Sequence, residues 1–201
     1  LMSIAYVGGK FGISIADVTT GDYYVTEVAT ERNVLDEINK FTPSEIICNH
    51  SFLMCGMDIE DIKNRLSISV FELEEWYFDE ENCSDILKEH FNIIDLSGLG
   101  ISEMSLGIIA SGSLLKYLYE TQKNSLSHLS KLIPYSTSTF MILDTSTRRN
   151  LELCETLREK QKRGSLLWVL DKTKTAMGAR TLRNYIEQPL IDKEEIINRQ
   201  K

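Results

Sequence analysis

The first residues whose types and spacing could do chemistry are carboxylates beside two predicted strands. Asp17 lies late on one predicted strand, and Asp22 lies in the turn that follows it. Nucleases that use two metal ions hold them on clustered carboxylates, one of which stands on the first strand of the sheet. The first predicted strand here, residues 3–7, reads SIAYV and carries no carboxylate. The sequence therefore favours solvated surface carboxylates, and a stand-alone metal-dependent nuclease is kept as the alternative function.

Two further sets of residues could bind a metal ion or a phosphate, and their spacing argues against both. The cysteines and histidines are scattered without a Cys-x-x-Cys pair, at Cys48, Cys55, Cys83, Cys154, His50, His90 and His128. Such spacing favours buried free thiols over a zinc or redox motif. Gly8-Gly9-Lys10 lacks the earlier glycine and the following Ser or Thr of a phosphate-binding loop, so it predicts a hairpin turn. No catalytic residue, cofactor site or metal site is predicted.

Charge is distributed unevenly along the chain, whose formal net charge is -8. Residues 1–100 carry 6 basic and 19 acidic side chains, a net charge of -13, and the remainder carries +5. An acidic run over 72–81 surrounds Trp76, Tyr77 and Phe78, which fits either a solvated loop with an aromatic core anchor or a protein-docking surface. The segment 148–183 holds ten basic and four acidic residues, and it could contact phosphates, stay solvated or contact the acidic half.

Length and composition limit the class of protein. The 201 residues are 42% apolar and 26% charged, which predicts one good-sized globular domain or two small ones. No apolar run is long enough to span a membrane, and the N-terminus lacks the basic flank and apolar core of a signal peptide. The sequence therefore predicts a cytoplasmic chain with free thiols and no membrane partner.

The first hundred residues switch repeatedly between strand and helix periodicity. The predicted strands cover 3–7, 13–18, 23–28, 45–48 and 68–73, and the predicted helices cover 34–41, 59–66 and 86–91. Three strands joined by short glycine turns form an antiparallel meander, and the later strands alternate with helices. This order is that of ribonuclease H-like folds. Residues 1–100 are therefore expected to form an α/β domain with a mixed sheet of that class.

From residue 101 onward the sequence predicts an all-α segment. A connecting helix is expected over 101–124, followed by the N-terminal part of a helical domain over 125–201. Residues 125–139 are polar and rich in Ser and Thr, so they are expected to form a linker or loop.

Four further elements are expected beyond this linker. Residues 140–143 read as an extended piece, and Asp144 is expected to cap a helix that contains Leu151, Cys154 and Leu157 and ends before Gly164. Further helices are expected at 166–170 and 176–186, and a last helix begins at Asp192. That helix is still running at Lys201, which is typical of a piece cut from a longer protein.

Three strings in this helical segment are distinctive. They read LDTSTRRNLEL over 143–153, RGSLLWVLDKTKTAMGARTLR over 163–183 and EQPL over 187–190. Together they closely resemble the start of the core (lever) domain of the MutS family of bacterial DNA mismatch-repair proteins. Residues 1–100 are similar to the connector domain of that family, which is ribonuclease H-like without catalytic residues. The motif residues are Asp144, Arg148, Arg149, Asn150, Leu151, Gly164, Ser165, Leu166, Asp171, Thr173, Thr175, Gly178, Arg180, Leu182, Gln188 and Pro189.

The resemblance implies a part of a mismatch-repair protein without catalysis of its own. In the family, the connector couples the ATPase to the domain that reads mispaired bases, and it docks MutL. ATP, Mg²⁺ and mismatched duplex DNA are bound by other domains of the full-length protein, a cytoplasmic, nucleoid-associated homodimer. The family's mismatch-reading Phe-x-Glu motif is matched by Phe78-Asp79-Glu80. We reject that match, because it lies inside the connector-like region among carboxylates that would repel DNA. Gly178 is expected to permit close helix packing.

Overall fold

The computed structural model describes residues 1–201 apart from 123–125, 137–140, 142, 144 and 201. The chain divides into two compact units, Leu1–Ser136 and Thr137–Lys201. The predicted domain boundaries fall after residues 100 and 124, whereas this division falls after Ser136. The difference arises because the helix after residue 101 and the segment that follows it pack into the first unit.

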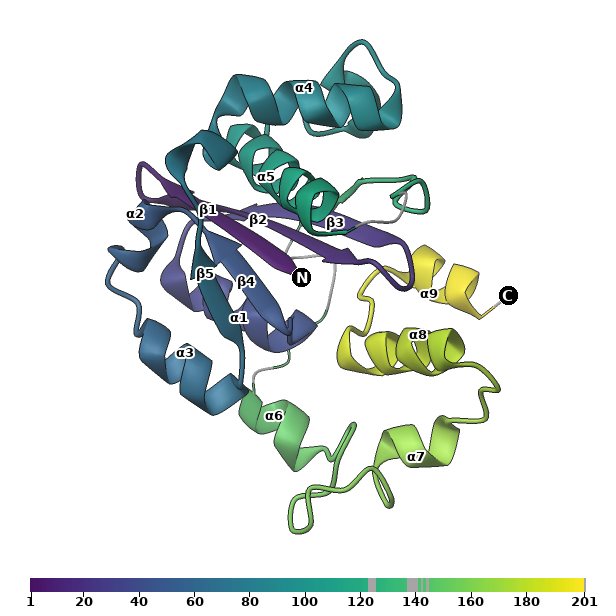
Figure 1. Cartoon of the computed structure of the whole chain (residues 1–201). Coiled ribbons are helices and arrows are strands. Elements are labelled where there is room, and N and C mark those ends of the chain that lie inside the picture. Colours follow the sequence, from purple (N-terminus) through teal and green to yellow (C-terminus); the bar gives the residue numbers. More distant parts are fainter. Residues whose placement is uncertain (123–125, 137–140, 142, 144, 201) are drawn as a thin grey trace. The chain divides into compact units, whose positions relative to one another are not determined.

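A mixed six-stranded sheet forms the centre of the first unit (Figure 1). Its strands are β1 (Met2–Val7), β2 (Lys10–Asp17), β3 (Asp22–Val28), β4 (Glu45–Cys48), β5 (Ser69–Glu72) and β6 (Ile133–Pro134). Their order in the sheet is β5-β4-β1-β2-β3-β6. The first three strands pair antiparallel as a meander, and β4, β5 and β6 each pair parallel to a neighbour. The predicted mixed α/β sheet is thereby confirmed, with one strand more than the sequence indicated.

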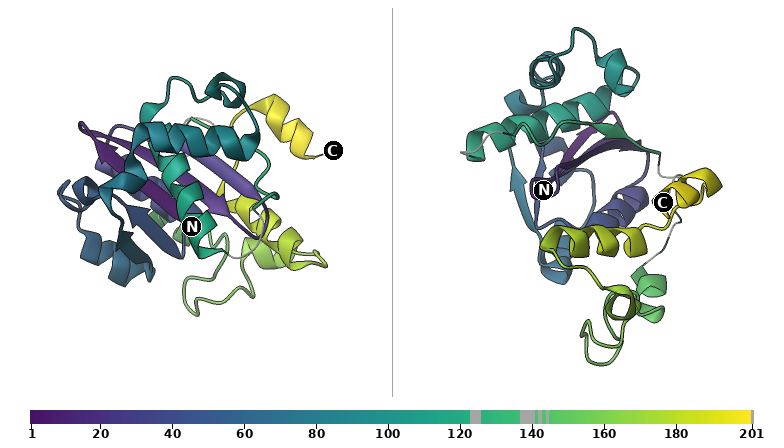
Figure 2. Two further views of the ribbon diagram at one scale, coloured as in Figure 1. Left: turned by 45° about the horizontal axis from the view of Figure 1, so that its top comes forward. Right: turned by 90° about the vertical axis from the view of Figure 1, so that its right-hand side faces the viewer.

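Helices cover both faces of this sheet (Figure 2). They are α1 (Glu31–Phe41), α2 (His50–Leu53), α3 (Ile59–Leu66), α4 (Glu80–Phe91) and α5 (Ser105–Thr121), with 3-10 turns η1 (Glu75–Phe78) and η2 (Leu96–Leu99). Helix α5 packs on β1, β2 and β3, α4 packs on the outer side of α5, and α1 lies on the opposite face of the sheet. The core therefore has a helix–sheet–helix arrangement with α4 as an additional outer layer.

The first turn of the meander shows how the sequence determines local structure. Gly8 and Gly9 have φ angles of 59° and 84°, and Val7 pairs directly with Lys10 across them. Two-residue hairpin loops with positive φ match the twist of the strands that they join, and glycine adopts these angles without a steric penalty. The predicted hairpin at Gly8-Gly9-Lys10 is confirmed.

Helix α5 is the central helix of the first unit, and it is buried on almost all sides. Every residue from Gly107 to Leu115 is buried, which fits its largely apolar sequence. Gly12 on β2 faces the backbone of Leu106, and Gly112 faces the backbone of Cys83 on α4. Glycine is required at both positions, because a Cβ atom at either would overlap backbone atoms of the neighbouring element.

The segment after α5 differs from the predicted linker. Leu126, Leu129 and Leu132 are buried in the main hydrophobic core, and the short strand β6 pairs with β3. The serines between these leucines made the segment look polar in sequence. The leucines recur every three residues, and the sheet and α5 supply the apolar surface that they cover.

The second unit consists of helices joined by long turns. They are α6 (Thr145–Asn150), α7 (Leu166–Leu170), α8 (Ala176–Glu187) and α9 (Lys193–Arg199). The first predicted helix was too long, because α6 ends at Asn150 and Glu152 adopts a left-handed φ of 48°. Cys154 therefore lies in a turn, and the predicted cap Asp144 and strand 140–143 fall largely outside the described residues. Asp192 caps α9 as predicted, with Oδ1 accepting from the amides of Glu194 and Glu195.

Candidate interaction surfaces

The carboxylates of the predicted nuclease alternative take part in a turn. Asp17 and Asp22 face each other at the end of the β2–β3 hairpin. Asp17 Oδ1 accepts a hydrogen bond of 2.8 Å from the amide of Thr19, and Asp22 Oδ2 accepts one of 2.6 Å from Thr20 Oγ1. Among the described residues, no group of three or more His, Cys, Asp or Glu side chains could hold a metal ion.

An acidic aromatic surface lies where η1 meets the C-terminal part of α5. We define it by Glu74, Trp76, Tyr77, Lys116, Tyr119 and Glu120. Trp76 is 45% exposed, and its Nε1 donates a hydrogen bond of 2.6 Å to Glu74. Lys116 Nζ lies 3.9 Å from the centroid of the Trp76 ring, within range of a cation–π contact. These contacts hold an exposed aromatic ring flat among carboxylates.

The tyrosines of this surface are held by hydrogen bonds to α4 and α5. Tyr77 donates its hydroxyl proton to Glu120, and this hydrogen bond raises the pKa of Tyr77 to about 12. His90 Nε2 lies 2.7 Å from the carbonyl of Leu129, so it is the nitrogen that carries the proton. His90 Nδ1 then accepts from the hydroxyl of Tyr119, at 2.6 Å. The surface is therefore largely preorganised.

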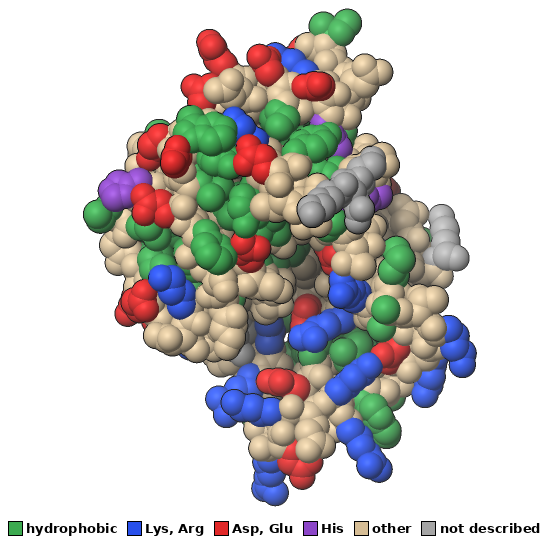
Figure 3. Space-filling view, in the orientation of Figure 1, with side chains coloured by type: hydrophobic (Ala, Val, Ile, Leu, Met, Phe, Trp, Pro, Cys, Tyr) green, Lys and Arg blue, Asp and Glu red, His purple; other side chains and the backbone are tan. Residues whose placement is uncertain are grey.

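A shallow pocket opens between α4 and α5 beside this surface. Its volume is about 390 Å³, and its lining residues are Ile86, Glu89, His90, Lys116, Tyr119 and Glu120. On the face of the first unit seen in Figure 3, acidic side chains gather around α4. Sequence reasoning found Trp76 and Tyr77 but missed Lys116, Tyr119 and Glu120. The only signal was that polar residues return at the C-terminal end of an otherwise apolar helix.

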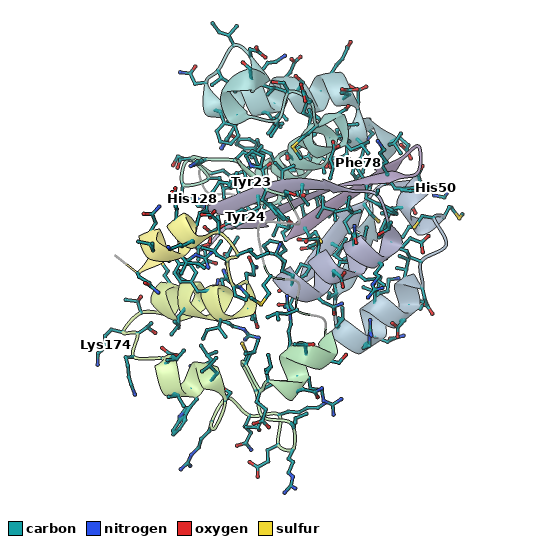
Figure 4. The ribbon with its side chains drawn as sticks, turned by 180° about the vertical axis from the view of Figure 1, so that it is seen from behind. Tyr23, Tyr24, His50, Phe78, His128 and Lys174 are labelled. Atoms are coloured by element: carbon teal, nitrogen blue, oxygen red, sulfur yellow. The ribbon has the colours of Figure 1, made fainter. Side chains whose placement is uncertain are left out.

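Phe78 belongs to the core, which decides between the two interpretations of its motif. It is buried in a cluster with Ala5, Ile109 and Ala110, and Figure 4 labels its position. A mismatch-reading phenylalanine must protrude to reach a base step, so the rejection of Phe78-Asp79-Glu80 as such a motif is confirmed. The predicted core anchor in the acidic run over 72–81 is thus Phe78, whereas the Trp76 ring of the same run is exposed.

All four cysteines are free, as predicted, and they differ in accessibility. Cys48 and Cys83 are buried, whereas Cys55 and Cys154 are partly exposed. Burial raises the pKa of the Cys48 and Cys83 thiols to about 12. Burial, followed by the neighbouring Glu187, also raises the pKa of Cys154 to about 12. Because the thiolate is the reactive form, the raised pKa values make Cys48, Cys83 and Cys154 slow to react, whereas Cys55 is partly exposed.

We expect a thiol reagent at pH 8 to label Cys55 first in the native chain. The pKa of about 12 lowers the thiolate fraction of Cys48, Cys83 and Cys154 roughly 1,000-fold relative to an ordinary thiol near 9. Mass spectrometry of peptides after timed labelling measures each rate. The Cys55→Ser variant should lose the fast phase, and fast labelling of Cys83 in the folded chain would contradict the packing of α4 on α5.

The motif residues of the second unit shape turns and helix starts. Ser165 is buried and caps α7, with Oγ accepting from Trp168 N at 3.2 Å. Asp171 ends α7 and accepts from Thr173 Oγ1 at 2.6 Å and from Lys162. The hydrogen bond from Lys162, followed by those from Thr173, lowers the pKa of Asp171 to about 2. These residues therefore fix the loops around α7, and Gly164 supplies a left-handed φ of 95° before it.

Gly178 lies in the first turn of α8 and makes a different contact from the one predicted. Its amide donates to Thr175 Oγ1 at 3.0 Å, which caps the helix. A Cβ atom at Gly178 would approach Thr173 and Thr175, the residues just before the helix, so close packing against another helix is not the reason for glycine here.

The remaining motif residues divide between contacts and exposure. Arg148 Nε donates to the carbonyl of Leu143 at 3.0 Å, and the carbonyl of Pro189 accepts from Met141 N at 2.8 Å. Gln188 is buried, and Leu182 is half-buried. Arg149, Asn150, Leu151, Leu166 and Arg180 are exposed. Asp144 lies outside the described residues.

Basic side chains cover much of the second unit on the face seen in Figure 3. Lys162 and Lys172 line a pocket of about 320 Å³ together with the exposed Trp168. Arg183 pairs with Glu187 at 3.0 Å, so part of the basic segment is neutralised within its own helix. Several apolar residues of this unit are also exposed, among them Leu166, Trp168, Val169 and Leu170. Such a set is typical of a surface that packs against further structure.

The fold and the surfaces together define a mixed α/β domain with an acidic aromatic surface, followed by a basic helical unit. Comparisons with known proteins agree with this division. The family model for MutS domain II matches residues 1–130, and the model for MutS domain III matches residues 146–201. The chain therefore belongs to the MutS family of DNA mismatch-repair proteins. Among the described residues, no helix is long and apolar enough to cross a membrane.

Curated relatives carry the same family name over nearly the whole chain. The DNA mismatch repair protein MutS of Lachnoclostridium phytofermentans is 62% identical over 196 residues, which cover 98% of this chain and 21% of the relative. Those of Ruminiclostridium cellulolyticum and Protochlamydia amoebophila are 48% and 38% identical, each over 98% of this chain and covering 22% and 23% of the relative. The chain thus spans about a fifth of the length of these relatives.

Proposed function

We propose that this chain couples the mismatch-reading and ATPase parts of a DNA mismatch-repair protein and docks MutL, without catalysis of its own. The docking role is supported by the acidic aromatic surface, which lies on a compact α/β unit. Exposed Trp and Tyr rings held by hydrogen bonds are the side chains that contribute most to protein contacts, because little conformational entropy is lost when a partner covers them.

Charge supports a basic partner surface for this docking. Residues 1–100 carry a net charge of -13, and Glu74, Glu89 and Glu120 lie around the exposed rings. Opposite charge on the partner accelerates encounter and makes binding sensitive to salt. The proposed partner region is the N-terminal ATPase domain of MutL, which the family membership suggests. The surface needs α5, so the proposal extends to the whole first unit, Leu1–Ser136.

The coupling role rests on the division of the chain into two units. Each of the two units is compact by itself. Conformational changes are commonly transmitted between distant sites by rigid blocks that move as units. The proposal assigns the first unit to the connector and the second to the start of the core domain. A DNA-repair role of this kind would place the protein in the cytoplasm, associated with the nucleoid.

ATP and Mg²⁺ belong to the proposal only through the full-length protein. The described residues do not fit a nucleotide: Gly8-Gly9-Lys10 closes a hairpin rather than leading into a helix, and Lys10 lies within β2. We propose that nucleotide, Mg²⁺, mismatched duplex and the homodimer contact are held by parts of the protein outside these residues. We assign the basic side chains on the face of the second unit seen in Figure 3 to contacts with other domains of the same protein.

We expect MutL to crosslink to a full-length protein that carries one introduced cysteine on α4, at Glu89→Cys beside the acidic aromatic surface, in the presence of mismatched DNA and ATP. The matched control is Glu60→Cys, which places an exposed cysteine on α3 of the same unit. Other reactive cysteines are first removed from both proteins. The Trp76→Ala variant in the Glu89→Cys background should reduce crosslinking about 10-fold, because an exposed aromatic anchor is removed.

The outcomes of this experiment are distinct. Higher crosslinking from α4 than from α3, lowered by Trp76→Ala and by raised salt, supports docking on the acidic aromatic surface. Equal crosslinking from both helices, or crosslinks that form only from cysteines in residues 137–201, would defeat the proposal.

A further inference from the structure

A buried polar cluster joins α1 to the last residues of the first unit. Lys40 Nζ lies 3.0 Å from Glu37 Oε2, and the hydroxyl of Tyr135 donates a hydrogen bond of 2.5 Å to the same oxygen. All three side chains are less than 10% exposed. Glu37 and Lys40 are one helical turn apart on α1, whereas Tyr135 follows β6 almost a hundred residues later.

Aromatic rings enclose this cluster. Lys40 Nζ lies 4.3 Å from the centroid of the Tyr135 ring and 4.8 Å from that of Phe41. Tyr24 packs edge-on against Tyr135, with ring centroids 6.2 Å apart, from the face of β3 opposite to that of Tyr23 (Figure 4). Burial, followed by the charge of Glu37, holds the pKa of Tyr135 well above its usual range. The tyrosine is therefore a neutral hydrogen-bond donor.

The segment around Tyr135 pairs with the sheet over a short stretch, where β6 lies beside β3. Strand β6 comprises only Ile133 and Pro134, and proline has no amide proton to donate to the sheet. The amide of Tyr135 donates to the carbonyl of Val25 at 2.9 Å. A strand this short at the edge of a sheet pairs weakly, so side-chain contacts decide whether it stays in place.

We propose that Glu37, Lys40 and Tyr135 form a clasp that fixes where the chain leaves the first unit and that opens without unfolding the antiparallel meander. The division between the units falls directly after Ser136, one residue beyond the clasp. When the clasp is closed, residues 133–136 stay beside β3. When it is open, these residues leave β3 and lengthen the connection between the two units, whereas Leu132 stays in the core. The effect of the clasp on the rest of the protein rests on the proposed coupling role, and it is independent of the docking surface.

The arrangement of charges makes such opening feasible. Both charged partners belong to α1, so they remain a pair when Tyr135 leaves. Opening therefore leaves no single charge buried without its partner, which would be the costly outcome. The contacts that it breaks include the hydrogen bond of Tyr135 to Glu37, its cation–π contact with Lys40, its ring contact with Tyr24 and the pairing of β6 with β3, while the antiparallel meander stays paired. A two-state element of this size can be biased by forces from the rest of a larger protein.

Hydrogen exchange of the full-length protein tests the clasp, with Tyr135→Phe as the variant. Removing the hydroxyl deletes the hydrogen bond to Glu37 while the ring and the ion pair stay. We expect the amides of Ile133, Tyr135 and Ser136 to exchange about 10-fold faster, because a hydrogen bond to a charged group is lost. Amides of β2 and of α1 should exchange at unchanged rates. The matched control is Tyr117→Phe, which deletes another tyrosine–glutamate hydrogen bond, of 2.6 Å to Glu45, away from this exit.

The result separates the clasp from simple destabilisation. Faster exchange confined to residues 133–136 in Tyr135→Phe, and absent from Tyr117→Phe, supports the clasp. Unchanged exchange there, or an equal increase across β1, β2 and β3, would overturn it. MutL crosslinking from α4 should stay at its normal level in Tyr135→Phe. The crosslinking experiment therefore tests the docking proposal, and hydrogen exchange tests the clasp.

Discussion

Replacement of Gly112 by alanine is expected to lower the free energy of unfolding of the first unit by about 3 kcal/mol, at the upper end of overpacking costs. A Cβ atom at this position would lie 2.6 Å from the carbonyl oxygen of Cys83 and closer still to its Cα and Cβ. These are atoms of α4 itself, so no side chain can turn away to make room. Helices α4 and α5 must separate, and the core leucines between them lose contacts.

Chemical denaturation of the chain, followed by tryptophan fluorescence and circular dichroism, measures this effect. The matched control is Gly98→Ala in η2, where an added Cβ atom meets nothing within 4 Å and the backbone φ is ordinary. That variant should change stability by less than about 0.5 kcal/mol. A Gly112→Ala protein as stable as Gly98→Ala would show that α4 does not pack closely on α5.

The local signals of the sequence were sufficient for most elements of the first unit. The hairpin at Gly8-Gly9 follows from the φ angles that only glycine adopts readily, and the strands follow from alternation and turn spacing. The helix start at Asp192 follows from the capping chemistry of aspartate. Each of these features depends on residues within a few positions of one another. They could therefore be inferred without knowledge of the rest of the fold.

The features that were missed depend on residues far apart in the chain. Strand β6 has two residues, and its partner β3 lies more than a hundred residues earlier. Leu126 and Leu129 are separated by Ser127 and His128, so the sequence of this segment indicated a polar linker, and only the core of the first unit shows what the leucines cover. The early end of α6 at Asn150 likewise reflects the left-handed turn at Glu152. This position is not a glycine, so the sequence gives no sign of a left-handed turn there.

The interaction surfaces show the same limit. Trp76 and Tyr77 stood out because aromatic residues lie among carboxylates in one short run. Lys116, Tyr119 and Glu120 reach the same surface from α5, and the packing of α5 against η1 and α4 brings them there. The clasp combines residues 37, 40 and 135 in the same way. Charge patterning located the acidic half correctly, but tertiary structure decided which carboxylates surround exposed rings.

Replacement of Gly12 by alanine is expected to have the second large effect, because β2 is an inner strand of the sheet. A Cβ atom there would lie 2.8 Å from Leu106 Cβ and closer still to the carbonyl carbon and oxygen of Leu106. That carbonyl belongs to the first turn of α5, so relief requires the helix to rise from the sheet. We expect a loss of about 3 kcal/mol or more, a large part of the stability of a domain of this size.

Two further variants separate a backbone clash from a side-chain clash at this site. Trimming the neighbour in the double variant Gly12→Ala with Leu106→Ala should restore little stability, because the carbonyl group remains. Gly107→Ala is the graded control, since its added Cβ atom would meet only side-chain atoms of Val25 and Met104 at 3.0 Å or more. It should cost less than Gly12→Ala in the same denaturation measurement. Full rescue by Leu106→Ala would show that α5 begins farther from β2, and the close helix–sheet contact at Gly12 would then be wrong.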